Sequence, residues 1–504
     1  MNILMLLEMA ASGFGERVAL GSRRDGVTYQ ALHEAAAVGG ALVRSQGRRT
    51  VVYVGENGPG FPLALFAAAA ANVPFLPLNY RLASAQLVEV VNRQLAPIIV
   101  AGAHVDALRA TGLPVITPGE WINSCLGVGE SPDVEPASPD ADDIAVLLQT
   151  SGTTSAPKSA VLRHRHLASY VLGTVEFGSA AADEATLVSV PPYHIAAVAN
   201  LLTNLYAGRR IIYLPSFSAD GWLATVRAEN ITHAMVVPTM LARIVDELET
   251  TGGTAPSSLR SLSYGGSKMP RQVVERALRL FPGTGFVNAY GLTETSSSIA
   301  ILGPEDHREA LASGDPAVRA RLGSVGKPLP GVSVEIRDAD GRPCPPGVSG
   351  SIWVRGAQVA GEYLESGTTL DSDGWFYTRD QGYLDVDGYL YVEGRADDTI
   401  IRGGENIAPA EIEDVILDHP AVAEVAVAGV EDEEWGQRIA AFVVTKPGQA
   451  ADSDGIREWV RARLRSSKTP DIVMFLDELP QTATGKILRR VLVQQMKAAS
   501  LKKA

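Results

Sequence analysis

The stretch 149-QTSGTTSAPKSAVLRH-164 has the composition of a loop that holds phosphate groups. Gly152 lets the backbone approach a ligand closely, and Lys158 adds a positive charge. The stretch lacks the GxxxxGK(S/T) spacing of a mononucleotide P-loop, and loops of this composition also occur as plain surface turns. Hydroxyl groups for phosphate oxygens come from Thr150, Ser151, Thr153 and Thr154. The loop therefore decides the fold only together with other segments of the chain.

The bulk properties are those of a globular protein with more than one domain. A chain of 504 residues is too long for a single hydrophobic core. Its net charge of -13 argues against binding to nucleic acid or to an anionic membrane surface, because both need a basic surface. A small local basic pocket for a phosphate ligand is compatible with that charge. We therefore expect small-molecule partners.

Cysteine usage and the apolar segments predict a cytoplasmic protein without stable membrane insertion. Cys125 and Cys344 form no CxxC and no His/Cys cluster, which disfavours a disulfide framework or a zinc site. The first residues, MNILMLLEMA, have no basic region and carry Glu8, unlike a signal peptide. The longest apolar run, 61–78, is typical of a buried helix followed by a strand. It is interrupted by Asn72, Pro74 and Pro77.

Helical and strand-like patterns alternate over the first 320 residues. This alternation predicts a parallel α/β sheet arrangement, in two lobes. We expect strands within 50–58, 96–102 and 231–238, and helices over 60–72 and 221–230.

The pattern changes from about Gly323. Short alternating strands with turn residues between them are expected within 332–341, 350–356 and 388–394. They indicate a small antiparallel or barrel-like subdomain. Mixed α/β character then resumes, with a helix over 410–420 and strands within 423–430 and 438–444. We place a domain boundary near Asp397.

Six further segments follow the loop in order. They are 264-YGGSKMP-270, 288-NAYGLTE-294, 374-GWFYTRD-380, 394-GRADD-398, 403-GGEN-406 and 484-TGK-486. Together with the loop they are jointly specific, and the chain resembles the adenylate-forming superfamily from about residue 10 to residue 492. This superfamily comprises acyl-CoA synthetases, firefly luciferase and peptide-synthetase adenylation domains, and the chain is most similar to the acyl-CoA ligase branch.

The resemblance implies an α/β fold with two domains. The large N-terminal AMP-binding domain, 1–396, would contain two α/β lobes to about residue 322 and a small β-barrel over 323–396. The small, mobile α+β C-terminal domain, 397–504, would alternate between two orientations about a hinge at Asp397. The implied cofactors are ATP/AMP, Mg²⁺ and coenzyme A.

The resemblance also assigns a role to each motif residue. Residues 150–159 would wrap the ATP β- and γ-phosphates. Thr293 would meet the α-phosphate, Glu294 would hold Mg²⁺, and Lys486 would reach the carboxylate and the α-phosphate. Asp380 would accept both ribose hydroxyls, and Arg395 would also reach the ribose. The adenine site would be lined by Gly265, Gly266, Asn288, Ala289 and Tyr290.

Other residues are assigned to the acyl pocket and the thiol tunnel. His194 resembles the family residue between the two, although a lone histidine can also be a satisfied buried one. The loop that rotation brings to the thiol tunnel would be Gly403, Gly404, Glu405 and Asn406. The pocket walls would be Ile195, Ala196, Val198, Val237, Gly265 and Gly291, although apolar segments are more often core. These residues are apolar or small, so we expect a largely apolar carboxylic acid.

The chemistry explains these residue types. A carboxylate is a poor acyl donor, so it first attacks the α-phosphorus of ATP and becomes an acyl-AMP. Two anions must meet in that step, and Mg²⁺ with Lys486 would neutralise the developing charge. A thiol then attacks the acyl carbon, and AMP leaves after the C-terminal domain has rotated.

Three residues depart from the family pattern. Ser155 and Ser159 stand where the pattern TSGTTGxPKG has glycine, and Arg379 stands where TGD has glycine. A serine at either loop position would cost roughly 1–2 kcal/mol at positive φ or would force the loop into another shape. Arg379 could point to solvent, which we favour, pair with Asp380, or enter the nucleotide site.

These departures leave alternatives open. The first predicts that adenylation is impaired, so that the enzyme only transfers an acyl-AMP supplied by a separate adenylating enzyme to CoA. The second is a stand-alone adenylation enzyme that loads a carrier protein, although the segment 434-EWGQR-438 resembles that of CoA ligases. A nucleotide-binding protein without catalysis is disfavoured because Glu294, Asp380 and Lys486 are retained.

Overall fold

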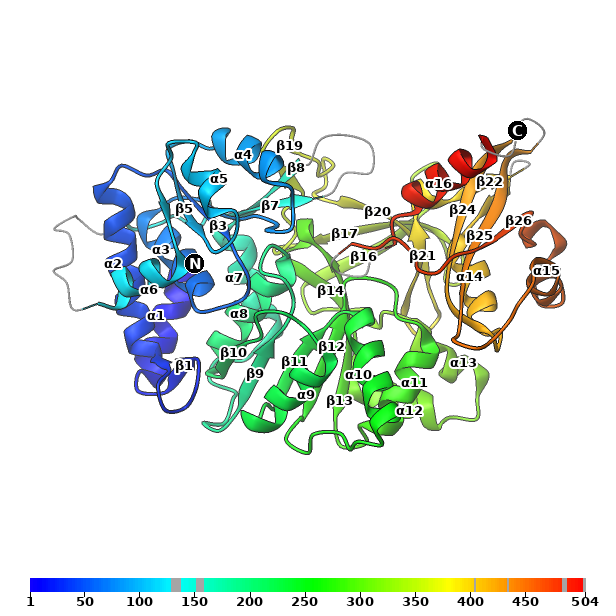
Figure 1. Ribbon diagram of the computed structural model, residues 1–504, viewed down its shortest axis with the longest axis horizontal. Coiled ribbons are helices and arrows are strands. Elements are labelled where there is room, and N and C mark those ends of the chain that lie inside the picture. The colour runs from blue at the N-terminus through cyan, green and yellow to red at the C-terminus, as the bar shows by residue number, and fades with distance from the viewer. Residues whose placement is uncertain (128–136, 151–157, 403–404, 433–434, 483–486, 502–504) are drawn as a thin grey trace.

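The computed structural model describes residues 1–127, 137–150, 158–402, 405–432, 435–482 and 487–501 (Figure 1). Its strands form two large sheets, a four-stranded sheet, a three-stranded sheet and a two-stranded hairpin. The described ranges contain no helix long and apolar enough to cross a membrane.

One large sheet has eight strands in the order β19-β18-β8-β7-β4-β3-β5-β6. Strands β4, β3, β5 and β6 are mutually parallel, and β7 joins β4 in parallel, whereas β8 and β18 run antiparallel to their neighbours. Their bounds are β3 Thr50–Val54, β4 Phe75–Pro77, β5 Pro97–Ala101, β6 Val115–Ile116, β7 Ile144–Thr150, β8 Lys158–Arg163, β18 Glu362–Tyr363 and β19 Gly367–Thr368.

The other large sheet has nine strands in the order β15-β14-β13-β12-β11-β9-β10-β1-β2. Its centre, from β13 to β1, is parallel, and antiparallel strands close both edges. The bounds are β1 Val18–Leu20, β2 Val27–Thr28, β9 Ala185–Val188, β10 Arg210–Tyr213, β11 His233–Val236, β12 Ser261–Gly265, β13 Gly285–Leu292, β14 Ser297–Leu302 and β15 Lys327–Pro328.

Helices cover these sheets because their apolar faces need a partner. The clearest case is α3, Gly60–Ala71, which is apolar on every side and is therefore buried on every side. The others are α1 Ile3–Phe14, α2 Tyr29–Ser45, α4 Ser84–Asn92, α5 Val105–Arg109, α6 Pro118–Leu126, α7 His164–Thr174, α8 Ile195–Ala207, α9 Ala219–Ala228, α10 Pro238–Thr251, α11 Arg271–Leu280, η1 Thr293–Thr295, α12 Pro304–Ala312, α13 Pro316–Ala320 and η2 Arg321–Gly323.

The segment expected to be barrel-like is a four-stranded antiparallel sheet in the order β16-β17-β20-β21. Its strands are β16 Val332–Arg337, β17 Gly350–Gly356, β20 Phe376–Leu384 and β21 Leu390–Arg395. Its inner face, including Ile336, Ile352 and Phe376, packs on Ile299 and Ala300 of β14. The sheet therefore needs no closure of its own, because β14 covers its apolar face.

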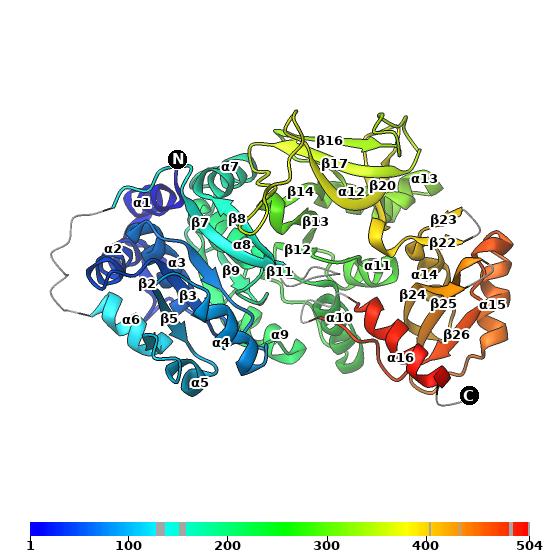
Figure 2. The same cartoon turned by 90° about the horizontal axis from the view of Figure 1, so that it is seen from above.

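The C-terminal part has its own core at one end of the molecule, beside α10 and α11 (Figure 2). Helix α14 packs on one face of the three-stranded sheet, and α16 packs on the other. The elements are η3 Ala396–Asp398, β22 Ile400–Arg402, β23 Glu405–Ile407, α14 Pro409–Leu417, β24 Val422–Asp432, β25 Gly436–Thr445, α15 Ser453–Arg461, η4 Ser466–Lys468, β26 Ile472–Phe475 and α16 Arg489–Leu501.

The expected α/β fold with a small additional domain is confirmed. Each strand and helix named from the sequence coincides with an element of that type, from β3 and α3 to β24 and β25. Alternating burial along β17 and β20 follows from one face packing on β14 while the other meets solvent.

Candidate active site

Three predicted nucleotide-binding residues form a buried polar group, the Asp380 cluster (Tyr290, Asp380 and Arg395). The Tyr290 hydroxyl donates to Asp380 Oδ2 at 2.6 Å, and Arg395 Nη1 donates to Oδ1 at 3.1 Å. Residues 380 and 395 are cross-strand neighbours in β20 and β21, whereas Tyr290 comes from β13. The Asp380 side chain is only 7% exposed.

Electrostatics keep the Asp380 cluster in its hydrogen-bonded form. Burial, together with the nearby Asp380 charge, raises the pKa of Tyr290 well above its usual value, so the phenol stays protonated and donates. A carboxylate has two acceptor oxygens with two lone pairs each, so this residue type suits two hydroxyls. The group is therefore compatible with the predicted contact to two ribose hydroxyls.

Glu294 lies in η1, directly after β13, and is 8% exposed. Its Oε1 accepts a hydrogen bond from the Tyr363 hydroxyl of β18. Burial and the Glu294 charge both raise the pKa of Tyr363. The backbone carbonyl of Glu294 also accepts from Ala360 N at 2.8 Å, which fixes the η1 turn against the segment that precedes β18. Thr293, the predicted α-phosphate contact, opens this turn.

The surroundings of Glu294 fit the predicted Mg²⁺. Magnesium is usually held by one or two carboxylates together with substrate phosphates and water, rather than by a full protein cage. The described residues contain no group of three or more His, Cys, Asp or Glu that could hold a metal alone. With Oε1 bound to Tyr363, the Oε2 oxygen of Glu294 has the chemistry of such a single ligand.

The glycines assigned to the adenine and acyl sites are explained by the sheet itself. A Cβ on Gly265 would lie 2.2 Å from Ala289 O in the neighbouring strand, and one on Gly291 would lie 1.8 Å from Ser297 O. Gly266 has a φ of 89°, which favours glycine. Close strand approach thus accounts for glycine at 265 and 291. The side chain of Asn288 donates to Ser324 O at 3.1 Å.

His194 stands just before α8, with its ring against that of Tyr193 at 4.6 Å between centroids. Its Nε2 is buried and has no hydrogen-bond partner within the described part of the chain. Burial, with a smaller effect of Arg81, lowers the pKa of His194 to about 4. The imidazole is therefore neutral at pH 7, and Nε2 is a buried polar atom for which the protein offers no described partner.

The predicted pocket walls divide into two kinds. Ile195 and Ala196, in the first turn of α8, are partly buried, whereas Val198 and Val237 belong to the core around the nine-stranded sheet. Val198 has 0% exposure. Its place in the core is thus explained without a ligand.

The described part of the phosphate loop is the β7–β8 pair. Thr150 and Lys158 lie opposite each other, and Lys158 Nζ lies 5.5 Å from the centre of the Tyr363 ring. Ser159 lies in β8 opposite Gln149 and does not have a positive φ, so it carries no left-handed strain. Ser151, Gly152, Thr153, Thr154 and Ser155 lie outside the described residues.

The Ser159 N–H has a partner that the sequence did not suggest. It donates to both oxygens of Glu365, at 2.9 and 3.2 Å, and we call this pair the Ser159 contact. Glu365 is exposed at the tip of the β18–β19 hairpin. Tyr363 and Glu365 were both missed because strands of two residues leave no periodic signal.

Arg379 adopts a backbone conformation that favours glycine. Its φ is 63°, so the chain keeps the left-handed geometry with an arginine in it. Its side chain is 58% exposed, as expected, and Nη1 lies 3.9 Å from Oδ2 of Asp397, the predicted hinge residue. At that distance and exposure the ion pair is weak.

The C-terminal domain meets the N-terminal part through polar contacts. Lys268 Nζ lies 2.7 Å from Asp414 Oδ2, and Gln272 Nε2 donates to Asp418 Oδ1 at 3.1 Å. Glu405 is exposed in β23. Gly403, Gly404 and Lys486 lie outside the described residues.

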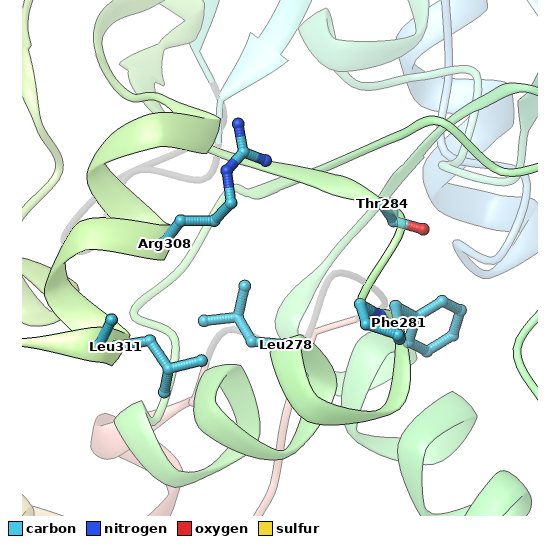
Figure 3. Close-up of a pocket in the computed structure, with 7 residues that line it drawn as sticks. Leu278, Phe281, Thr284, Arg308 and Leu311 are labelled. Atoms are coloured by element: carbon cyan, nitrogen blue, oxygen red, sulfur yellow. The ribbon is translucent and has the colours of Figure 1, made fainter.

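A separate cavity of about 270 Å³ lies between the end of α11 and α12. Figure 3 shows Leu278, Leu311 and Arg308 around it. Its lining contains none of the predicted site residues. It is a surface hollow away from the Asp380 cluster.

The two large sheets, the small antiparallel sheet and the separate C-terminal core make up the architecture of an adenylate-forming enzyme. The family profile of AMP-binding enzymes matches residues 7–364, and the profile of the AMP-binding enzyme C-terminal domain matches residues 411–486. The chain belongs to the family of AMP-binding enzymes.

Curated relatives are acid–thiol ligases. Indoleacetate–CoA ligase of Aromatoleum aromaticum is 34% identical over 461 residues, covering 87% of each chain. The fatty acid–[acyl-carrier-protein] ligase ScoC of Streptomyces coeruleorubidus is 33% identical and covers 92% of this chain and 91% of its own. The protein is accordingly an acid–thiol ligase.

A solved structure supports the fold and the predicted nucleotide. O-succinylbenzoate coenzyme A synthetase (MenE) of Bacillus subtilis, in complex with ATP and magnesium ion, superposes with a TM-score of 0.82. It is 28% identical, and the match covers 96% of this chain and 98% of that one. The predictions of family and fold are confirmed.

Proposed function

We propose that the protein is an acyl-CoA ligase that converts a mainly apolar carboxylic acid to its CoA thioester through an acyl-AMP. The Asp380 cluster carries this proposal, because a buried carboxylate held by fixed donors presents two acceptor oxygens, which suit two vicinal hydroxyls. The relatives named above act on acids with apolar bodies. That supports the substrate class, and the partly buried Ile195 and Ala196 agree with it.

Each half-reaction uses different residues of the site. In the first, the substrate carboxylate attacks the α-phosphorus and pyrophosphate leaves. Thr293 would orient the α-phosphate, and Lys486 would neutralise charge between the two anions. Mg²⁺, when bound at Glu294, supplies positive charge to the phosphates. Residues 150–159 would hold the β- and γ-phosphates, and Asn288, Ala289 and Gly266 would line the base.

In the second half-reaction a thiol attacks the acyl carbon and AMP leaves with its electron pair. The C-terminal domain, which we place at 397–504, would rotate about Asp397 between the two steps. Gly403, Gly404 and Glu405 would then line the thiol tunnel. Neutral His194 would stand between the tunnel and the acyl pocket. The exposed ion pair of Lys268 with Asp414 supports rotation, because a pair so open to solvent contributes little and separates at small cost.

We place the reaction in the cytoplasm, where Cys125 and Cys344, both free, stay reduced. Two narrower functions compete with the proposal. The Ser159 contact favours an enzyme that only transfers a supplied acyl-AMP to CoA, because Glu365 places negative charge at the phosphate loop. A carrier protein as acceptor is favoured by the similarity to ScoC.

A paired assay tests the proposal. One arm supplies indoleacetate, ferulate, succinylbenzoate or fatty acids with Mg-ATP and follows pyrophosphate release. The other supplies the corresponding acyl-AMP and compares CoA with a holo carrier protein. We expect both arms to proceed, with CoA preferred. Thioester formation without pyrophosphate release would establish the transfer-only function, and a preference for carrier protein would overturn the choice of acceptor.

A further inference from the structure

Glu365 is placed by contacts on both sides of it. On one side Tyr363 pairs with Ala160 of β8, and Leu364 N donates to Ser159 O at 2.9 Å. Glu362 is bound by the Arg163 guanidinium at 2.7 and 2.9 Å. On the other side the hairpin closes through Tyr363 and Gly367. The hairpin is thus tied to β8 at several points, and its tip carboxylate reaches the Ser159 N–H as a consequence.

The Ser159 N–H is the last backbone donor of the segment assigned to the ATP phosphates. A backbone N–H beside the phosphate loop can donate to an anion. The Glu365 carboxylate accepts this hydrogen bond with both of its oxygens, as a phosphate would. A carboxylate has one charge, whereas the β- and γ-phosphates of ATP carry several. Bringing them together costs free energy through like-charge repulsion.

We propose that Glu365 is a specificity-determining residue that weakens binding of nucleoside triphosphates relative to nucleoside monophosphates by occupying the Ser159 N–H. This inference rests on the proposed function, because it takes the ATP phosphates to lie along residues 150–159. AMP ends at the α-phosphate, so it lacks the β- and γ-phosphates that Glu365 would repel. The device therefore slows the ATP-dependent half-reaction and leaves transfer from acyl-AMP to CoA untouched.

Glu365→Gln tests the inference by titration calorimetry of Mg-ATP and of AMP on the full chain. Glutamine keeps an acceptor for the Ser159 N–H and removes only the charge. We expect Mg-ATP to bind about fivefold more tightly, from one like charge removed at a partly screened distance, with the gain shrinking in high salt. AMP affinity and the rate of thioester formation from acyl-AMP should not change.

A matched control is Asp373→Asn, which removes the same charge from an exposed turn before β20. An unchanged or weaker affinity for Mg-ATP in Glu365→Gln would overturn the inference. An equal gain for AMP, or the same gain in Asp373→Asn, would do so too, as would failure of both wild type and variant to bind Mg-ATP. Failure of the proposed function appears separately in the paired assay, as absence of pyrophosphate release from every acid or of thioester from every acyl-AMP.

Discussion

Around Asp380 two protein donors satisfy a carboxylate that is almost fully buried, whereas at Ser159 an exposed carboxylate sits on a backbone donor. Both places belong to the proposed nucleotide site. In the Asp380 cluster the protein fixes a carboxylate in place, and a ligand hydroxyl would be added to its existing contacts. In the Ser159 contact the protein has already filled a donor with an anion of its own. The two places therefore differ in what a nucleotide would have to do. At Asp380 it would add a hydrogen bond to those already present, whereas at Ser159 it would have to displace the Glu365 carboxylate.

The largest test of this contrast is Asp380→Ala. It leaves the buried Tyr290 hydroxyl and the Arg395 guanidinium without their acceptor, at a cost of about 3–5 kcal/mol. If Asp380 also accepts the ribose, both half-reactions should fall by roughly a hundredfold to a thousandfold. Pyrophosphate release and thioester formation check this, and Asp380→Asn serves as the control of matched shape. Loss of thermal stability with activity within tenfold of wild type would leave Asp380 a structural role only.

A smaller effect is expected from Tyr290→Phe. The variant removes one hydrogen bond to a charged acceptor, worth about 1.5–3 kcal/mol, and keeps the ring. AMP affinity should weaken by about tenfold to hundredfold, as calorimetry would show. Tyr391→Phe, in the stacked pair with Tyr383, is the control. Equal AMP affinity in wild type and Tyr290→Phe would show that the Asp380 cluster is not part of the nucleotide site.

Arg379→Gly tests the strained backbone beside Asp380. Glycine accepts a φ of 63° without the penalty that a side chain carries, so unfolding should become harder by about 1 kcal/mol. The melting temperature should rise by roughly one or two degrees for a domain of this size. Arg379→Ala keeps the strained backbone and loses only the weak pair with Asp397. A rise in Arg379→Ala equal to that in Arg379→Gly would attribute the effect to charge.

The smallest effect is expected from Ser159→Gly. Because Ser159 lies in extended backbone, glycine relieves no strain and costs about 0.5–1 kcal/mol in strand stability. Mg-ATP affinity should stay within about twofold of wild type, since the Glu365 charge remains. A tenfold gain in Mg-ATP affinity would instead show that the serine side chain limits the site.

Much of the fold was predictable because hydrophobic periodicity and turn residues are local properties of the sequence. The alternation of helices and strands, the buried α3 and the change near Gly323 all follow from periodicity and turn residues. Residues 290, 294 and 380 came from motifs whose chemistry demands their residue types. The contact of Tyr290 with Asp380 could not be predicted, because β13 meets the paired strands β20 and β21 only through tertiary packing.

The parts that the sequence did not reveal have identifiable physical causes. Glu365 reaches Ser159 across 206 residues of sequence, through a hairpin with strands of two residues. The left-handed Arg379 could not be inferred because arginine has no preference for that conformation. Ser159 carries no left-handed strain because the residue continues a paired strand instead of turning.

Gly265 and Gly291 bear on how such an enzyme can be redesigned. At each position a β-carbon would collide with a carbonyl of the adjoining strand, so the backbone, and not the acid, selects glycine. A combinatorial library that randomised these two positions to change acid preference would consist mainly of damaged sheets. Ile195 and Ala196 are better positions to randomise, because their side chains are partly exposed at the start of α8. The two glycines are required by the packing of neighbouring strands and give no information about the substrate.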